Sequence, residues 1–273
     1  MRFRFHPRLL ALAVLAFTFN AARADLMLHP TRIVFDKSTR SAQVELINNG
    51  NEPATYRLRL VNRRMAETGE FTAVDTPLPG ELFAESMLRF SPRQVTVPPG
   101  GAQTVRLMLR KEADLADGEY RSHLQFDRIE TPATTPASIT PDAAAPKAIG
   151  IALTALVGAS MPIIVRQGPL KARLTLSNLH LDGQNLSLLF ERSGDASVYG
   201  DLAVTFTPQG GAPVAVASMG GVAVYVPNPR RRAIVPLKLP AGMALQKGHL
   251  AVVYRERPDQ GGAVLARADV ELP

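Results

Sequence analysis

The sequence predicts an all-β fold with two sandwich domains, and three observations lead to this prediction. Apolar and polar residues alternate with period two in many segments, as in Tyr56–Leu60 and Val105–Leu109, which places one face of a strand in a core and the other in water. Turn residues such as Asn48–Asn51 and Pro98–Gly101 separate these segments at intervals of about ten residues. No segment shows a long amphipathic helical pattern. Strands with this spacing are typical of antiparallel sandwiches.

Two breaks in the alternation divide the chain. Residues 131–148 are rich in Pro, Ala and Thr and have no periodicity, which indicates a mobile loop. A Gly-Pro pair interrupts the pattern at Arg166–Pro169, and seven short alternating segments follow it. We therefore expect a first domain over residues 25–166 and a second over residues 167–273, set at an angle with a cleft near Arg166.

The N-terminal residues have the pattern of a segment that is cleaved off during secretion. Arg2, Arg4 and Arg8 precede an uncharged apolar stretch, Leu9–Phe19, and the small-residue sequence Ala22-Arg23-Ala24 follows. This order is typical of a secretory signal peptide over residues 1–24. The alternative is a membrane anchor, but the apolar stretch is short for crossing a bilayer. We expect a secreted protein with no membrane insertion.

The net charge and the cysteine content limit the possible classes of protein. Four of the 31 basic residues and none of the 24 acidic residues lie in the signal segment, so the net charge of the secreted chain falls from +7 to +3. This balance does not indicate a nucleic-acid partner, and the basic run Pro229–Arg232 is interpreted as a solvated loop. The chain has no Cys, so a secreted form must depend on its hydrophobic core rather than on disulfides.

The sequence gives no indication of an enzyme or of a cofactor. The four His of the secreted chain do not form a metal-ligand spacing with one another or with a carboxylate. It contains no nucleophile elbow, phosphate-binding loop or Cys nucleophile. We therefore expect no catalytic residues, no metal and no cofactor.

One uncharged segment, Ala148–Val165, needs a separate interpretation. Its length would allow a short transmembrane helix or a buried helix. However, its odd positions are apolar and its even positions are small or weakly polar, which is a period of two and favours a long strand. A long apolar strand at a sheet edge templates pairing with other chains unless charge protects it. We expect this strand to pair with a partner.

At this point the sequence resembles a known family, the periplasmic chaperones of the chaperone–usher pathway (PapD-like). The resemblance covers the whole secreted chain and is strongest over residues 26–166. It rests on the order of several short matches together with the uncharged strand that ends in Arg166: Thr31–Phe35, Val44–Asn49, Pro53–Tyr56, Phe90–Pro92, Val97–Gly100, Gln103–Leu107 and Gly118–Arg121. It implies two immunoglobulin-like sandwiches joined in a boomerang-like shape, a periplasmic location and no ATP requirement.

The resemblance also implies a mechanism, donor-strand complementation. A pilin or fimbrial subunit lacks its last strand, and the chaperone supplies one of its own before the subunit passes to an outer-membrane usher. Alternate apolar side chains of the donor strand fill the pockets of the subunit. In this chain they would be Ile149, Ile151, Leu153, Ala155 and Val157. The same exposed strand would permit self-association in the absence of a subunit.

Two sets of charged residues complete the implied site. A basic pair in the cleft of the family holds the C-terminal carboxylate of the subunit, and Arg32 matches its first member. We expect Arg32 to be exposed, so that its replacement weakens binding without unfolding the protein. The second member is a Lys near the end of the donor strand, but Leu156–Pro162 contains no base. Glu119 and Arg166 match an interdomain salt bridge, to which Asp259 or Glu256 would add a third charge.

A different class of function stays open at this stage. A structural or adhesive subunit of a surface appendage would also be built from immunoglobulin-like modules. Such a subunit would carry a polymerising N-terminal extension, whereas the first predicted strand of this chain begins near Leu26, almost at the cleavage site. This favours the chaperone.

Overall fold

The computed structural model describes residues 26–129 and 158–273. In these two ranges every regular element is a strand, apart from two single 3-10 turns, Glu85–Met87 and Pro258–Gln260, and the all-β prediction is confirmed. The predicted signal peptide and the predicted loop over 131–148 lie outside the described residues. So does the whole predicted partner-binding face: Ile149, Ile151, Leu153, Ala155 and Val157.

The first sandwich packs two sheets against one core. The four-stranded sheet has the order β1-β3-β9-β7, and the five-stranded sheet has the order β2-β11-β10-β4-β8. Phe35, Leu107 and Phe126 are fully buried between them. The strands are β1 (Leu26–His29), β2 (Ile33–Phe35), β3 (Ser41–Asn48), β4 (Ala54–Val61), β7 (Leu88–Ser91), β8 (Gln94–Val97), β9 (Ala102–Leu109), β10 (Gly118–Ile129) and β11 (Ala159–Gln167).

The second sandwich is built from the seven alternating segments that follow the Gly-Pro break. A three-stranded sheet, β12-β13-β16, packs on a four-stranded sheet, β15-β14-β17-β18. Phe190, Phe206 and Tyr254 are fully buried in its core. The strands are β12 (Ala172–Asp182), β13 (Asn185–Gly194), β14 (Val198–Pro208), β15 (Val214–Val224), β16 (Arg230–Pro236), β17 (Gly248–Glu256) and β18 (Val264–Leu272).

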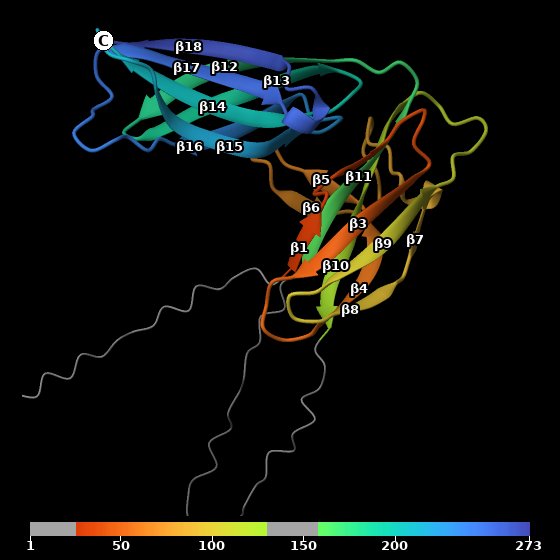
Figure 1. Cartoon of the computed structure of the whole chain (residues 1–273). Helices are drawn as coiled ribbons and strands as arrows, with labels where there is room; N and C mark the ends of the chain where they lie inside the picture. Colours follow the sequence, from red (N-terminus) through yellow and green to blue (C-terminus); the bar gives the residue numbers. More distant parts are fainter. Residues whose placement is uncertain (1–25, 130–157) are drawn as a thin grey trace, which may run out of the picture.

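A short hairpin joins the two sandwiches, which are set at an angle as predicted (Figure 1). It consists of β5 (Arg63–Met65) and β6 (Phe71–Ala73), which extend from the first sandwich toward the second. Met65 is buried in the core of the second sandwich. At the hairpin, the side chain of Asn228 donates to the Met65 carbonyl at 2.7 Å, and the backbone amide of Arg232 donates to the Glu67 carbonyl at 2.7 Å. These bonds hold one wall of the interdomain cleft in place.

Candidate functional site in the interdomain cleft

Arg32 lies at the centre of the cleft, directly before β2. Its side chain is buried, with the residue only 9% exposed. One guanidinium nitrogen donates to the Ser197 hydroxyl of the second sandwich at 3.1 Å. The guanidinium also lies over the rings of Tyr199, at 4.7 Å, and Tyr225, at 5.6 Å, which is a favourable arrangement for a cation beside aromatic faces.

The burial of Arg32 corrects the expectation that it is an exposed charge. The second sandwich covers Arg32. The alternation of residues in the first sandwich does not predict this contact between domains. Burial lowers the pKa of the Arg32 guanidinium, because removing a charge from water disfavours the charged form. Within the described ranges no carboxylate lies within ion-pair distance of it, and its Nε has no hydrogen-bond partner. A buried charged group with an unpaired donor lowers the stability of the fold unless a ligand supplies the missing partner.

A pocket of ≈ 330 Å³ opens beside Arg32. Its lining comes from both sandwiches, from the β5–β6 hairpin and from the start of β11, and includes Thr31, Arg63, Phe71, His123, Pro162 and Tyr225. The walls are therefore mostly apolar with a few polar groups, as in sites that orient a small ligand group. Two of the lining residues, Arg32 and Arg63, carry positive charge.

Glu119 and Arg166 form a second charged group in the same cleft. They are cross-strand neighbours on β10 and β11, and the Arg166 Nε donates to Glu119 at 3.0 Å. Ser197 joins them from the second sandwich: its backbone amide donates to Glu119 at 3.0 Å, and its carbonyl accepts from Arg166 at 3.1 Å. Glu119 is only 4% exposed. The structure thus brings these two predicted residues together and attaches them to the other domain.

Asp259 does not join this group, which corrects the sequence-based expectation. Its carboxylate lies 3.6 Å from Arg257, in its own domain, and its side chain is 73% exposed. Where a third charge was expected, the backbone of Ser197 supplies a donor and an acceptor. A peptide group carries no sequence signature, so residue types alone could not have identified it.

Arg121 is a buried cation to which the sequence gave no role. It lies on β10, 8% exposed, with its guanidinium 4.5 Å from the Tyr225 ring centre. It donates to the carbonyls of Arg63 at 3.1 Å and Val226 at 3.4 Å, and thereby links the hairpin to the second sandwich. Its Nε has no partner in the described chain. Arg121 does not line the pocket but packs against Tyr225, which does.

The edge of β11 leads into the pocket. On one side β11 pairs antiparallel with β10 from Ala159 to Gln167. On the other side β2 pairs with it in parallel, but only at Ile163–Val165. In the part of the chain that the structure describes, Ala159–Pro162 therefore has an unpaired edge on the β2 side. Ser160 and Pro162 of this edge line the pocket beside Arg32.

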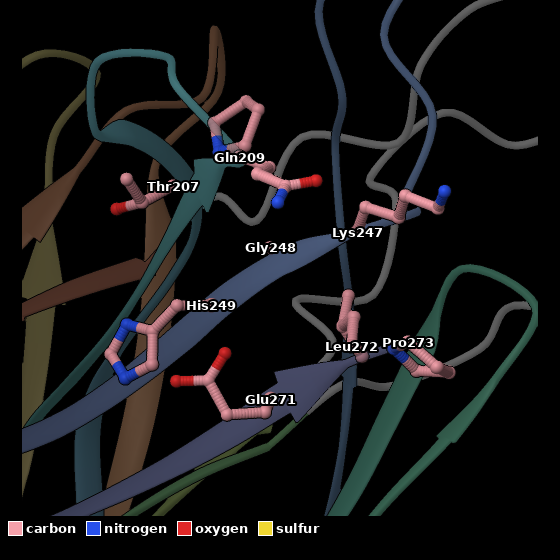
Figure 2. A pocket seen from close by; sticks show the side chains of 9 residues that line it. Thr207, Gln209, Lys247, Gly248, His249, Glu271, Leu272 and Pro273 are labelled. Atoms are coloured by element: carbon pink, nitrogen blue, oxygen red, sulfur yellow. The ribbon is translucent and has the colours of Figure 1, made fainter.

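A second hollow, of ≈ 530 Å³, lies at the far end of the second sandwich. Figure 2 shows its lining, with the side chains of His249 and Glu271 next to each other on β17 and β18. All of its lining residues are at least partly exposed. No buried charge converges on this hollow, so the interdomain cleft is the stronger candidate.

Two features are absent from residues 26–129 and 158–273. In these ranges no group of three or more His, Asp or Glu is placed to hold a metal ion. No helix there is long and apolar enough to cross a membrane.

The fold and the cleft define an all-β protein of two sandwiches with a cationic pocket between them. No protein-family model matches the chain, and no curated protein matches it. Among solved structures it is similar to the CupB2 chaperone of Pseudomonas aeruginosa, with 13% identity over 90% of this chain and 100% of that chain and a TM-score of 0.43.

Two solved chaperone complexes match this chain with similar identities and TM-scores. The CsuC–CsuE chaperone–tip adhesion subunit complex of Acinetobacter baumannii matches with 12% identity over 91% of this chain and 98% of that chain, at a TM-score of 0.42. The complex of the SafB chaperone with the SafA pilin of Salmonella enterica matches with 13% identity over 90% and 96%, at a TM-score of 0.41.

Proposed function

We propose that this chain is a periplasmic chaperone that binds pilin or fimbrial subunits by donor-strand complementation and delivers them to an outer-membrane usher. One observation carries the proposal: an unpaired edge of β11 ends at a pocket where a buried guanidinium lacks an anionic partner. An open strand edge binds an extended chain through backbone hydrogen bonds. A cation at its end selects for a chain that carries a negative charge there.

The strand directions support a C-terminal carboxylate as that charge. β2 runs parallel to β11 and begins directly after Arg32. A partner strand that pairs in parallel with the free edge at Ala159–Pro162 would lie in line with β2 and point toward it. Its C-terminus would then meet Arg32. Because a guanidinium fork matches the two oxygens of a carboxylate, Arg32 is suited to hold this end.

The residue pattern of the segment that leads into β11 supports strand pairing at this edge. Residues 149–157 precede the open edge and alternate between apolar and small side chains. We infer that they continue the edge as the donor strand, with the odd positions turned toward the core of the subunit. Ile151 and Leu153 would then fill apolar pockets, where burial contributes about 2 kcal/mol for each side chain.

An experiment on the two faces tests this mechanism. Ile151→Asp or Leu153→Asp would place a carboxylate in an apolar groove, where it has no partner, and should abolish recovery of a co-expressed soluble subunit. The matched controls Gly150→Asp and Thr154→Asp add the same charge to the opposite face and should reduce recovery less. Candidate subunits are those encoded beside this gene.

The possible outcomes separate the alternatives. Equal loss on the two faces would contradict donor-strand complementation. Unfolding of the Ile151 and Leu153 variants on their own would mean that these side chains belong to the core of this protein. A one-to-one complex with the subunit supports the chaperone, whereas polymers of this chain would indicate a structural subunit of an appendage.

A further inference from the structure

The base of the β5–β6 hairpin is fixed to the first sandwich. Arg64 on β5 donates through two guanidinium nitrogens to the two carboxylate oxygens of Glu81, each at 2.7 Å, and the Glu81 side chain is only 5% exposed. A two-point ion pair of this kind sets a direction as well as supplying energy. Glu81 lies in the loop before β7, and this loop is tied to β10 because the Arg121 amide donates to the Leu82 carbonyl at 2.8 Å. The hairpin therefore leaves the first sandwich in a fixed direction.

The apolar side chains of the same hairpin belong to the core of the second sandwich. Met65 is 2% exposed and is buried in the cluster that contains Phe190 and Tyr225. Phe71, on the other strand of the hairpin, packs against this cluster with its ring centre 5.9 Å from that of Tyr225. A two-stranded hairpin alone is at best marginally stable in water. The second sandwich thus provides the burial that keeps the hairpin folded.

The turn of the hairpin also lies close against the second sandwich. Gly69 has a φ of +91°, and a Cβ atom at this position would lie 2.7 Å from the Arg231 guanidinium. That guanidinium is held in place, because it donates to the Ala223 carbonyl at 2.7 Å. Asn228 and Arg232 donate to backbone carbonyls of the same hairpin. A glycine is therefore required here both by the left-handed backbone and by the close approach.

We propose that the β5–β6 hairpin is a strap that completes the core of the second sandwich and makes the two sandwiches unfold as one cooperative unit. Its base depends on the first sandwich and its apolar contacts depend on the second, so it cannot stay docked when either of them unfolds. Each sandwich then loses contacts when the other opens, which couples their stabilities. The inference goes beyond the proposed function and does not depend on it, because it concerns only contacts within this chain.

The experiment measures the unfolding of each sandwich separately in the full secreted chain. Hydrogen exchange in increasing urea, read by mass spectrometry, gives one midpoint for peptides of β9 in the first sandwich and another for peptides of β14 in the second. The test variant is Met65→Ala, which removes the buried side chain of the strap. The matched control is Met87→Ala, because Met87 is 3% exposed and lies in the core of the first sandwich.

We expect the two midpoints to coincide in the unchanged protein. Met65→Ala should lower the midpoint of the second sandwich by about 1 M urea relative to that of the first, because it leaves a cavity in one core and weakens the link between the two. Met87→Ala should lower both midpoints together, since the strap stays intact. Separate midpoints in the unchanged protein, or coincident midpoints in Met65→Ala, would overturn the proposal.

A milder pair of variants decides the question if Met65→Ala does not fold. Gly69→Ala places a methyl group against the Arg231 guanidinium. Gly183→Ala places the same group at another left-handed position, with φ +57° and no atom of the described chain within 4 Å, so the two variants share the cost of a left-handed alanine. Gly69→Ala should separate the two midpoints, whereas Gly183→Ala should leave them coincident. An equal response to the two substitutions would contradict the role of the hairpin.

Discussion

Two groups of charged residues lie in one cleft and differ in whether the protein neutralises them. The Glu119–Arg166 pair is closed: each member is bonded to the other and to the backbone of Ser197. Arg32 and Arg63 are open, because each keeps an unpaired Nε and neither has an anionic partner in the described residues. The closed group connects the two domains, and the open group has unused capacity for a ligand. The comparison teaches that neither burial nor an unpaired Nε identifies a binding site alone, because Arg121 has both and does not line the pocket, whereas Arg32 and Arg63 do.

The closed pair should matter most for stability. Glu119→Ala removes the carboxylate that two groups share, so that Arg166 and the Ser197 amide lose an acceptor. We expect the free energy of unfolding to fall by about 3 kcal/mol, which is typical of breaking a buried, hydrogen-bonded charge pair. Chemical denaturation measures this loss, and small-angle scattering shows whether the two sandwiches change their relative orientation. A loss below about 0.5 kcal/mol, the range of an ordinary surface substitution, would mean that the pair does not hold the domains.

Substitution in the open group should affect binding more than stability. Arg32→Gln removes a buried charge that has no ion-pair partner in the described residues, so the free energy of unfolding should stay unchanged or rise. Affinity for the subunit should fall by about tenfold or more, because a charge-assisted hydrogen bond is lost. Titration of the purified subunit domain measures the affinity. If Arg32→Gln lowers stability as much as Glu119→Ala and leaves affinity intact, the distinction between the two groups is wrong.

His123 should make stability depend on pH. Its pKa is lowered from 6.5 to about 3 in the folded protein, so the unfolded chain binds the proton more readily. The contribution of the neutral ring is complete above the unfolded pKa and is lost as the pH falls from about 6.5 toward 3, by at most about 1.4 kcal/mol per pH unit. His123→Gln should reduce this slope in denaturation curves between pH 7 and 4. His180→Gln, at an exposed position on β12, is the control and should not change it.

The smallest effect is expected at Asp259. Its carboxylate is mostly exposed and pairs with Arg257 rather than with the closed group. Asp259→Asn should change the free energy of unfolding by less than about 0.5 kcal/mol, as is usual for an exposed ion pair. A loss comparable with that of Glu119→Ala would restore Asp259 to the interdomain bridge.

The fold could be predicted from the sequence because most strands have one face in a core and one in water. In β9, for example, Val105, Leu107 and Leu109 are buried and Arg106 is exposed. The pattern is lost in β10, where every residue from Gly118 to Phe126 is buried. One side of this strand faces its own core, and residues on the other side, such as Arg121, meet the second domain.

The site could be predicted only in part, for the same reason. Arg32, Glu119 and Arg166 came from a resemblance in short motifs. Arg63, His123 and Ser197 join them through the hairpin and through the contact between domains, and neither alternation nor spacing specifies such a contact. The sequence has no base in Leu156–Pro162, and among the described residues the second cation that lines the pocket is Arg63 of the hairpin.

The most direct test of the account is a cross-link between the cleft and the end of the bound subunit. The chain contains no Cys, so Thr31→Cys, at the exposed rim of the pocket beside Arg32, introduces a single thiol. Thr175→Cys, exposed on β12 of the second sandwich, is the control. We predict that Thr31→Cys forms a disulfide with a Cys placed next to the C-terminus of the subunit, and that Thr175→Cys does not. A disulfide that forms equally at the two positions, or only with a Cys near the N-terminus of the subunit, would contradict a partner strand that runs parallel to β11 and ends at Arg32.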